Sequence, residues 1–169
     1  MKNYKKLDPL KINENAIDLI GNKWMLITAG TIESYNTMTA SWGGIGMLWN
    51  KPVVFIFVRP QRFTYQFTEK NENFTCTFFD EKHRDALRFC GSKSGRDFDK
   101  AAETGLTPIA TDAGNIIFAE ASLVLECKKL YFQDIDPQGF VSPDIQKNYP
   151  AKDYHRMYIG EITFAGIKE

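Results

Sequence analysis

The sequence of 169 residues carries 21 basic and 21 acidic side chains. A chain of this length fits one domain and can bury a core without disulfides or a structural metal. Because the charges balance, the composition excludes binding of nucleic acid or an anionic membrane through a global positive field. Cys76, Cys90 and Cys127 are far apart and form no metal-ligand motif, which favours a reducing compartment. We expect a cytoplasmic single domain over residues 1–169, with no metal site, export signal or membrane span.

Six runs rich in β-branched and aromatic residues are typical of strands. They are Trp24–Ile32, Val53–Val58, Phe74–Phe79, Ile116–Ala119, Ser122–Gln133 and Tyr154–Ile167. Polar and apolar residues nearly alternate in Ser122–Gln133 and Tyr154–Phe164, which indicates antiparallel strands with one solvated face. Val53–Val58 is apolar throughout, so we predict that both of its faces are buried.

Three shorter stretches carry helix signals. They are Asn13–Ile20 closed by Gly21, Arg62–Lys70 after Pro60, and Glu81–Cys90 closed by Gly91. No internal repeat or linker interrupts the chain. This pattern favours one closed or nearly closed antiparallel barrel with accessory helices on its rim.

Small hydroxyl residues and glycines follow the first predicted strand, in the stretch from Asn36 to Gly44. Hydroxyl groups and open backbone N–H groups allow the close approach of a phosphate or of the polar edge of a ring ligand. Thr39, Ala40, Ser41 and Trp42 lie in this stretch. The same composition also suits an ordinary hairpin.

Two arginines and a hydroxyl follow the apolar strand: Arg59, Arg62 and Thr64, at the start of a predicted helix. Guanidinium donors and the positive end of a helix dipole favour the same dianion, so these residues form a candidate phosphate clamp. The alternative is that the arginines lie on a solvated face.

A third candidate segment joins two predicted helices and contains Ser94, Gly95 and Lys100. Residues 82–100 hold six basic and three acidic side chains, an excess that suggests a nearby anion. As an alternative, Asp97 in this segment caps a helix that begins at Phe98.

Four motifs together resemble the flavin reductase-like, FMN-binding split-barrel family. They are T-x-S-W from Thr39, R-P-x-R-x-T from Arg59, S-G-R-D-x-D-K from Ser94 and H-x-x-Y-x-G-E from His155, and they span nearly the whole chain. The resemblance implies a mainly β fold, an antiparallel Greek-key split barrel with short accessory helices.

The resemblance also implies roles for these residues. Thr39 to Trp42 match the segment along the flavin ring and ribityl chain, and Arg59, Arg62 and Thr64 match the phosphate side. Ser94, Gly95 and Lys100 match the loop that closes on the FMN. His155 is the candidate catalytic residue, because the family places a histidine near the flavin or the nicotinamide entrance. His83 has no such positional support.

The resemblance implies an FMN-dependent oxidoreductase that takes hydride from NAD(P)H and passes electrons to a small acceptor or a partner oxygenase. The alternative is a non-enzymatic FMN-binding electron carrier of the flavoredoxin type. A pyridoxamine-phosphate oxidase-like or haem-binding relative is a third class, against which S-G-R-D-x-D-K argues. No G-x-G-x-x-G motif precedes a helix, so no Rossmann site is expected.

We expect a homodimer with FMN at the subunit interface, because the clamp segments lie at strand ends where a second subunit can cover a shallow groove. Residues 135–151 match no motif. They are a candidate region for substrate preference.

Overall fold

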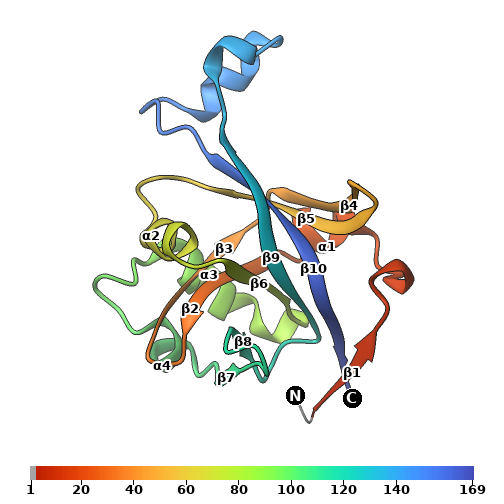
Figure 1. Cartoon of the computed structure of the whole chain (residues 1–169). Coiled ribbons are helices and arrows are strands. Elements are labelled where there is room, and N and C mark those ends of the chain that lie inside the picture. Colours follow the sequence, from red (N-terminus) through yellow and green to blue (C-terminus); the bar gives the residue numbers. More distant parts are fainter. Residues whose placement is uncertain (1–2) are drawn as a thin grey trace.

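An antiparallel sheet of eight strands forms the centre of the molecule (Figure 1). The structure is a computed structural model that describes residues 3–169. The strands pair in the order β3-β2-β6-β9-β10-β5-β4, and β1 pairs with β10. Their bounds are β1 Tyr4–Leu7, β2 Met25–Thr31, β3 Ser34–Ala40, β4 Gly43–Leu48, β5 Lys51–Val58, β6 Asn73–Phe78, β9 Leu123–Asp134 and β10 Arg156–Lys168. The predicted mainly β, antiparallel fold is therefore confirmed.

A small hairpin and short helices surround this sheet. The hairpin pairs β7 (Pro108–Ala110) with β8 (Ile116–Phe118). The α-helices are α1 (Ala16–Gly21), α2 (Phe63–Lys70), α3 (Arg84–Ser92) and α4 (Lys100–Thr104), and short 3-10 helices cover Pro9–Lys11, Glu81–His83, Pro137–Gly139 and Pro143–Asn148. The three predicted helices are present, although Glu81–His83 forms a 3-10 turn before α3.

The polar stretch from Asn36 to Ala40 follows strand β2, as expected, but it is itself part of a strand, β3, which was not predicted. Within β3 the polar side chains bond inside the protein: the Thr28 hydroxyl donates to Thr37 Oγ1 at 2.8 Å, and Asn36 Nδ2 donates to Thr64 Oγ1 at 2.6 Å. Because these groups satisfy one another, polar residues occupy buried strand positions that an apolar pattern normally marks.

The prediction that both faces of Val53–Val58 are buried was also wrong. Val54, Ile56 and Val58 are fully buried, whereas Phe55 and Phe57 on the opposite face are only partly buried. The partner strand β4 places glycines beside Phe55, so one face of β5 stays open near its end. Successive side chains of a strand point to opposite faces, so Phe55 and Phe57 are more exposed than the residues on either side of them.

The buried side chains form two packed groups. One lies between the strands and includes Met25, Ile27, Phe74, Leu125 and Tyr158. The second joins α3 and the β7–β8 hairpin to the outer side of the sheet, through Leu26, Leu87, Phe118 and Val124 among others. Packing on both sides of β2 therefore fixes the position of α3 against the end of β3.

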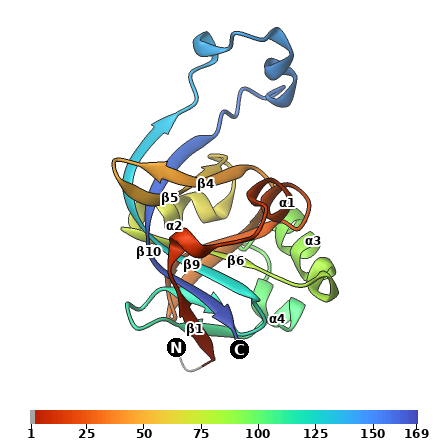
Figure 2. The same cartoon turned by 90° about the vertical axis from the view of Figure 1, so that its right-hand side faces the viewer.

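Strands β9 and β10 continue beyond the body of the sheet into a projecting arm, residues 135–155 (Figures 1 and 2). The arm contains the two 3-10 turns Pro137–Gly139 and Pro143–Asn148. Its returning end leads directly into β10 at Arg156. The segment that matched no motif is thus a separate projection whose end reaches the sheet at His155.

Gly160 in β10 allows an aromatic ring to pack directly on the backbone. A Cβ at this position would lie 2.6 Å from Cε1 and Cζ of Phe74 and 2.9 Å from Cβ of Cys127. Phe74 and Cys127 are fully buried, so neither can move aside without disturbing the core. Close packing therefore explains the glycine of the H-x-x-Y-x-G-E motif.

We predict that Gly160→Ala lowers the free energy of unfolding by about 1–3 kcal/mol, because overpacking a core forces side chains out of their preferred rotamers. Urea denaturation measures the change. Gly21→Ala is the matched control, because nothing lies within 4 Å of the added methyl group at the end of α1. Equal stability of Gly160→Ala and the parent protein would contradict this account.

Candidate functional site

A pocket of about 200 Å³ lies where β3 ends, beside the end of β5 and the start of β10. Its lining residues are Met38, Thr39, Ala40, Ser41, Trp42, Phe57, Arg59, Arg62 and His155. The structure thus brings together seven of the eleven predicted site residues. Thr64, Ser94, Gly95 and Lys100 do not line this pocket.

Thr39 and Ser41 form the wall between this pocket and an adjoining cavity of about 480 Å³. The Thr39 hydroxyl donates to the Leu87 carbonyl of α3 at 2.5 Å, which fixes the end of β3 against the helix. Gly91 of α3 leaves room for this approach, since a Cβ there would lie 3.3 Å from Thr39 Cβ. The end of β3 therefore separates the pocket from the larger cavity beside α3.

Arg59 connects the pocket to the projecting arm. Its Nη1 lies 2.5 Å from Asp153 Oδ2, and its Nη2 donates to the Asn148 carbonyl at 2.9 Å. The guanidinium also lies over the Tyr149 ring, 5.1 Å from the centroid. The hydrogen bond from Arg59 lowers the pKa of Asp153. Arg59 therefore holds the arm as well as lining the pocket.

Arg62 and Lys100 satisfy carbonyl groups at the carboxyl end of α3. Arg62 donates to the Gly91 carbonyl at 2.6 Å and to the Cys90 carbonyl at 3.2 Å. Lys100 Nζ donates to the Cys90 carbonyl at 2.9 Å and to the Thr37 carbonyl at 2.8 Å. A helix leaves its last carbonyl groups without partners, and cations near that end also favour the helix dipole.

Lys100 is only 5% exposed, and its ammonium points at backbone groups inside the protein. Burial, with a further contribution from the Arg62 charge, lowers the pKa of Lys100 to about 8. Direct contact of Lys100 with a phosphate stays a prediction. In the structure its ammonium joins the Thr37 carbonyl of β3 to the Cys90 carbonyl of α3.

The S-G-R-D-x-D-K loop packs against β3 and the start of α2. A Cβ on Gly95 would overlap the Asn36 side chain, which itself donates to the buried Thr64 hydroxyl. Arg96 lies over the Phe63 ring, 4.8 Å from its centroid. For Ser94, Gly95 and Thr64, contact with a ligand stays a prediction.

The alternative reading of Asp97 as a helix cap was wrong by two residues. Asp99 caps α4, and its Oδ1 accepts from the backbone N–H groups of Ala101 and Ala102 at 3.1 Å each. The helix begins at Lys100, not at Phe98, because an N-cap carboxylate must reach the second and third amides of the first turn.

His155 lies on the pocket wall and is only 7% exposed. Its ring lies 5.2 Å from that of Trp42 and 6.4 Å from that of Phe57, and its Nδ1 is 2.9 Å from the Tyr149 hydroxyl. Burial, followed by the positive charge of Arg59, lowers its pKa to about 4. Because the unfolded chain takes up this proton first, the contribution of His155 to stability falls as the pH drops from about 6.5 toward 4.

Four residues of this region were not singled out from the sequence: Met38, Phe57, Tyr149 and Asp153. Phe57 could have been found, because strand alternation places it opposite the buried Ile56 and Val58. Tyr149 and Asp153 carry no local signal. They reach the site only because the arm folds back onto Arg59.

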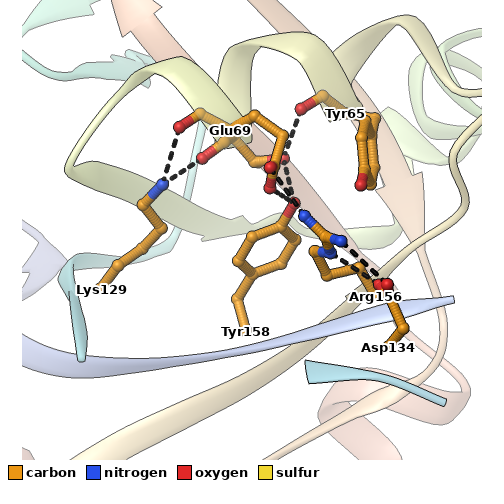
Figure 3. A network of polar contacts seen from close by, with 7 residues as sticks. Tyr65, Glu69, Lys129, Asp134, Arg156 and Tyr158 are labelled. Carbon is orange, nitrogen blue, oxygen red and sulfur yellow. Dashed lines mark hydrogen bonds and ion pairs between the residues drawn. The ribbon is translucent and has the colours of Figure 1, made fainter. Parts of the chain in front are cut away.

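A polar network fastens the base of the arm to α2 (Figure 3). Arg156 makes a bidentate ion pair with Asp134, with distances of 2.6 and 2.8 Å, and a second ion pair with Glu69 at 2.7 Å. The Tyr158 hydroxyl donates to Glu69, and Lys129 donates to the last carbonyls of α2, those of Thr68 and Glu69. The hydrogen bonds from Arg156 lower the pKa of Asp134.

The described residues, 3–169, contain no cluster of three or more side chains suited to a metal ion. Within the same range, no helix is long and apolar enough to cross a bilayer.

The family model described as "Flavin reductase like domain" matches residues 18–169. No curated protein sequence matches the chain. Among solved structures, an FMN-binding domain of a flavin reductases-like enzyme from Shewanella baltica aligns with a TM-score of 0.71 at 20% identity, over 98% of this chain and 78% of that one.

Two further structures share the fold. Flavoredoxin from Methanosarcina acetivorans aligns with a TM-score of 0.67 at 20% identity, over 87% of this chain and 69% of its own. An NADH:FAD oxidoreductase from Streptomyces globisporus aligns with a TM-score of 0.64 at 18% identity, over 86% and 74% respectively.

We predict that Lys100→Met lowers the free energy of unfolding by about 1–3 kcal/mol, because it leaves the Thr37 and Cys90 carbonyls without this donor in a buried place. Lys82→Met is the control, since Lys82 is exposed. Thermal or urea unfolding of both variants measures the difference. If Lys100→Met proves as stable as Lys82→Met, the capping role assigned to Lys100 is wrong.

Proposed function

The chain belongs to the flavin reductase like family, and from this premise we propose that it binds FMN in the pocket at the end of β3 and acts as an NAD(P)H-dependent flavin reductase. The observation that carries the proposal is the convergence of Thr39–Trp42, Arg59, Arg62 and His155 on one pocket. When bound, FMN supplies a hydride acceptor that can pass electrons on to a small acceptor.

The residues present fit the chemistry of this cofactor. Arg59 and Arg62 each use two of the five N–H donors of a guanidinium in the hydrogen bonds described above, which leaves donors for a phosphate. Ser41 is exposed and lines the pocket, so its hydroxyl can contact the polar edge of the ring. Trp42 and Phe57 supply aromatic walls on the same pocket.

In this proposal the protein contributes position and hydrogen bonding. The end of β3, held on α3 by Thr39, orients the ring, and the arginines neutralise the phosphate. His155 contacts the nicotinamide or the flavin as a neutral imidazole. No side chain needs to move a proton in the hydride step, so geometry matters more than titration.

We predict that NADH or NADPH reduces the FMN-loaded protein under anaerobic conditions, seen as loss of the absorbance of oxidised flavin in stopped flow. Ser41→Trp fills the pocket and should abolish the reaction. Ser142→Trp is the matched control, because it places the same ring on an exposed part of the arm. His155→Ala should raise KM for the nucleotide more than it lowers kcat.

If the bound FMN is never reduced by either nucleotide, the chain is an electron carrier of the flavoredoxin type. If His155→Ala abolishes reduction while FMN stays bound, an acid–base role of His155 must replace the present account.

We also propose that a second copy of the chain completes the site. The pocket, about 200 Å³, is smaller than the range of roughly 300–1,000 Å³ in which drug-sized ligands bind. Trp42 on its wall is 45% exposed, which leaves an aromatic surface for a partner to cover.

Light scattering should therefore give about twice the chain mass of 19.3 kDa for the FMN-loaded protein. A monomer that retains FMN through gel filtration would contradict the shared site.

A further inference from the structure

The two ring nitrogens of His155 have different surroundings. Nδ1 lies 2.9 Å from the hydroxyl of Tyr149, a residue of the arm. Nε2 has no hydrogen-bond partner among residues 3–169. It is also not fully enclosed by protein atoms. Since His155 lines the pocket, Nε2 is the ring nitrogen that a ligand can reach.

The proton in the Tyr149–His155 bond belongs to the tyrosine. Tyr149 is 3% exposed, and among the described residues its hydroxyl has no acceptor other than Nδ1. A buried O–H group that does not donate loses a hydrogen bond, so Tyr149 donates and Nδ1 accepts. In a neutral imidazole the remaining proton then sits on Nε2.

Burial, followed by the positive charge of Arg59, keeps the His155 ring neutral, whereas the Asp153 carboxylate favours the charged form. Arg59 and Asp153 are the charged groups that act on it, and Tyr149 is its titratable hydrogen-bond partner. The lowered pKa of about 4 means that the imidazole stays uncharged down to that pH. An imidazolium, with a proton on each nitrogen, could not accept from Tyr149.

Aromatic packing fixes the orientation of Tyr149. Its ring stacks on Phe140 at 5.9 Å with an interplanar angle of 17°, and Arg59 covers it from 5.1 Å. Tyr154, also in the arm, packs against Tyr149 at 5.0 Å, but its hydroxyl bonds to Gln146. Of these two neighbouring tyrosines, only Tyr149 reaches His155.

We propose that Tyr149 is a positioning residue: it fixes His155 as a hydrogen-bond donor, with Nε2–H directed at a carbonyl oxygen of the ring ligand in the pocket. Two sources can supply that oxygen, the carboxamide of a nicotinamide or a carbonyl of the flavin ring. The inference rests on the proposed function for the identity of the ligand, whereas the tautomer of His155 does not depend on it.

Nitrogen-15 NMR of the histidine ring in the FMN-loaded protein tests the proposal first. The chain has two histidines, so His83→Gln assigns the His155 signals. We expect the neutral Nε2–H tautomer between pH 5 and 8. Tyr149→Phe should give a mixture of tautomers, while Tyr154→Phe should leave the spectrum unchanged.

Ligand binding separates the two sources of the carbonyl. Losing one neutral hydrogen bond weakens binding by roughly two- to tenfold. If the partner is nicotinamide, Tyr149→Phe raises KM for NADH or NADPH by this factor, with kcat and FMN affinity nearly constant. If the partner is the flavin, the Kd for FMN rises instead.

An Nδ1–H tautomer in the parent protein would overturn the proposal, as would a tautomer that Tyr149→Phe leaves unchanged. Failure of the proposed function looks different: the flavin is then not reduced by NAD(P)H, although the NMR result still identifies His155 as a donor.

Discussion

Backbone carbonyl groups at the carboxyl ends of two helices accept hydrogen bonds from cationic side chains, and the geometry of the site depends on these bonds. Arg62 and Lys100 donate hydrogen bonds to carbonyls at the end of α3, and Lys129 donates to a carbonyl at the end of α2. Leaving such carbonyls buried without a donor would be costly, so each cation is held where its helix ends. Because Lys100 also binds the Thr37 carbonyl, the same bonds fasten α3 to β3.

This arrangement explains why the pocket forms at the end of β3. The strand is held on α3 through Thr39 and Lys100, and Arg62 donates to carbonyls at the same helix end. The arm is fastened twice, at its base through Arg156 and at its returning end through Arg59. The attachment through Arg59 places Tyr149 of the arm against His155. The arm, which matches no motif, therefore orients the His155 ring in the pocket.

Much of the architecture could be predicted from the sequence, because strands with long apolar or alternating runs, such as β5 and β9, carry a strong local signal. Strand β3 was missed because its polar residues bond to one another inside the protein. Seven of the site residues expected from the motifs line one pocket: the contiguous Thr39–Trp42 and, from separate segments, Arg59, Arg62 and His155. Tyr149 and Asp153 could not be predicted, since their contacts depend on how the arm folds back. The motif residues Thr64 and Lys100 lie next to the pocket residues in sequence or space, yet their side chains are used inside the protein.

A crystal structure of the protein with FMN tests the central claim most directly. The account predicts the flavin ring along Thr39–Trp42, with the phosphate near Arg59 or Arg62. A larger cavity of about 560 Å³ lies elsewhere, between the N-terminal segment and Phe79, and is lined by Leu7, Leu19 and Leu123 among others. FMN bound in that cavity, with the β3 pocket empty, would contradict the account.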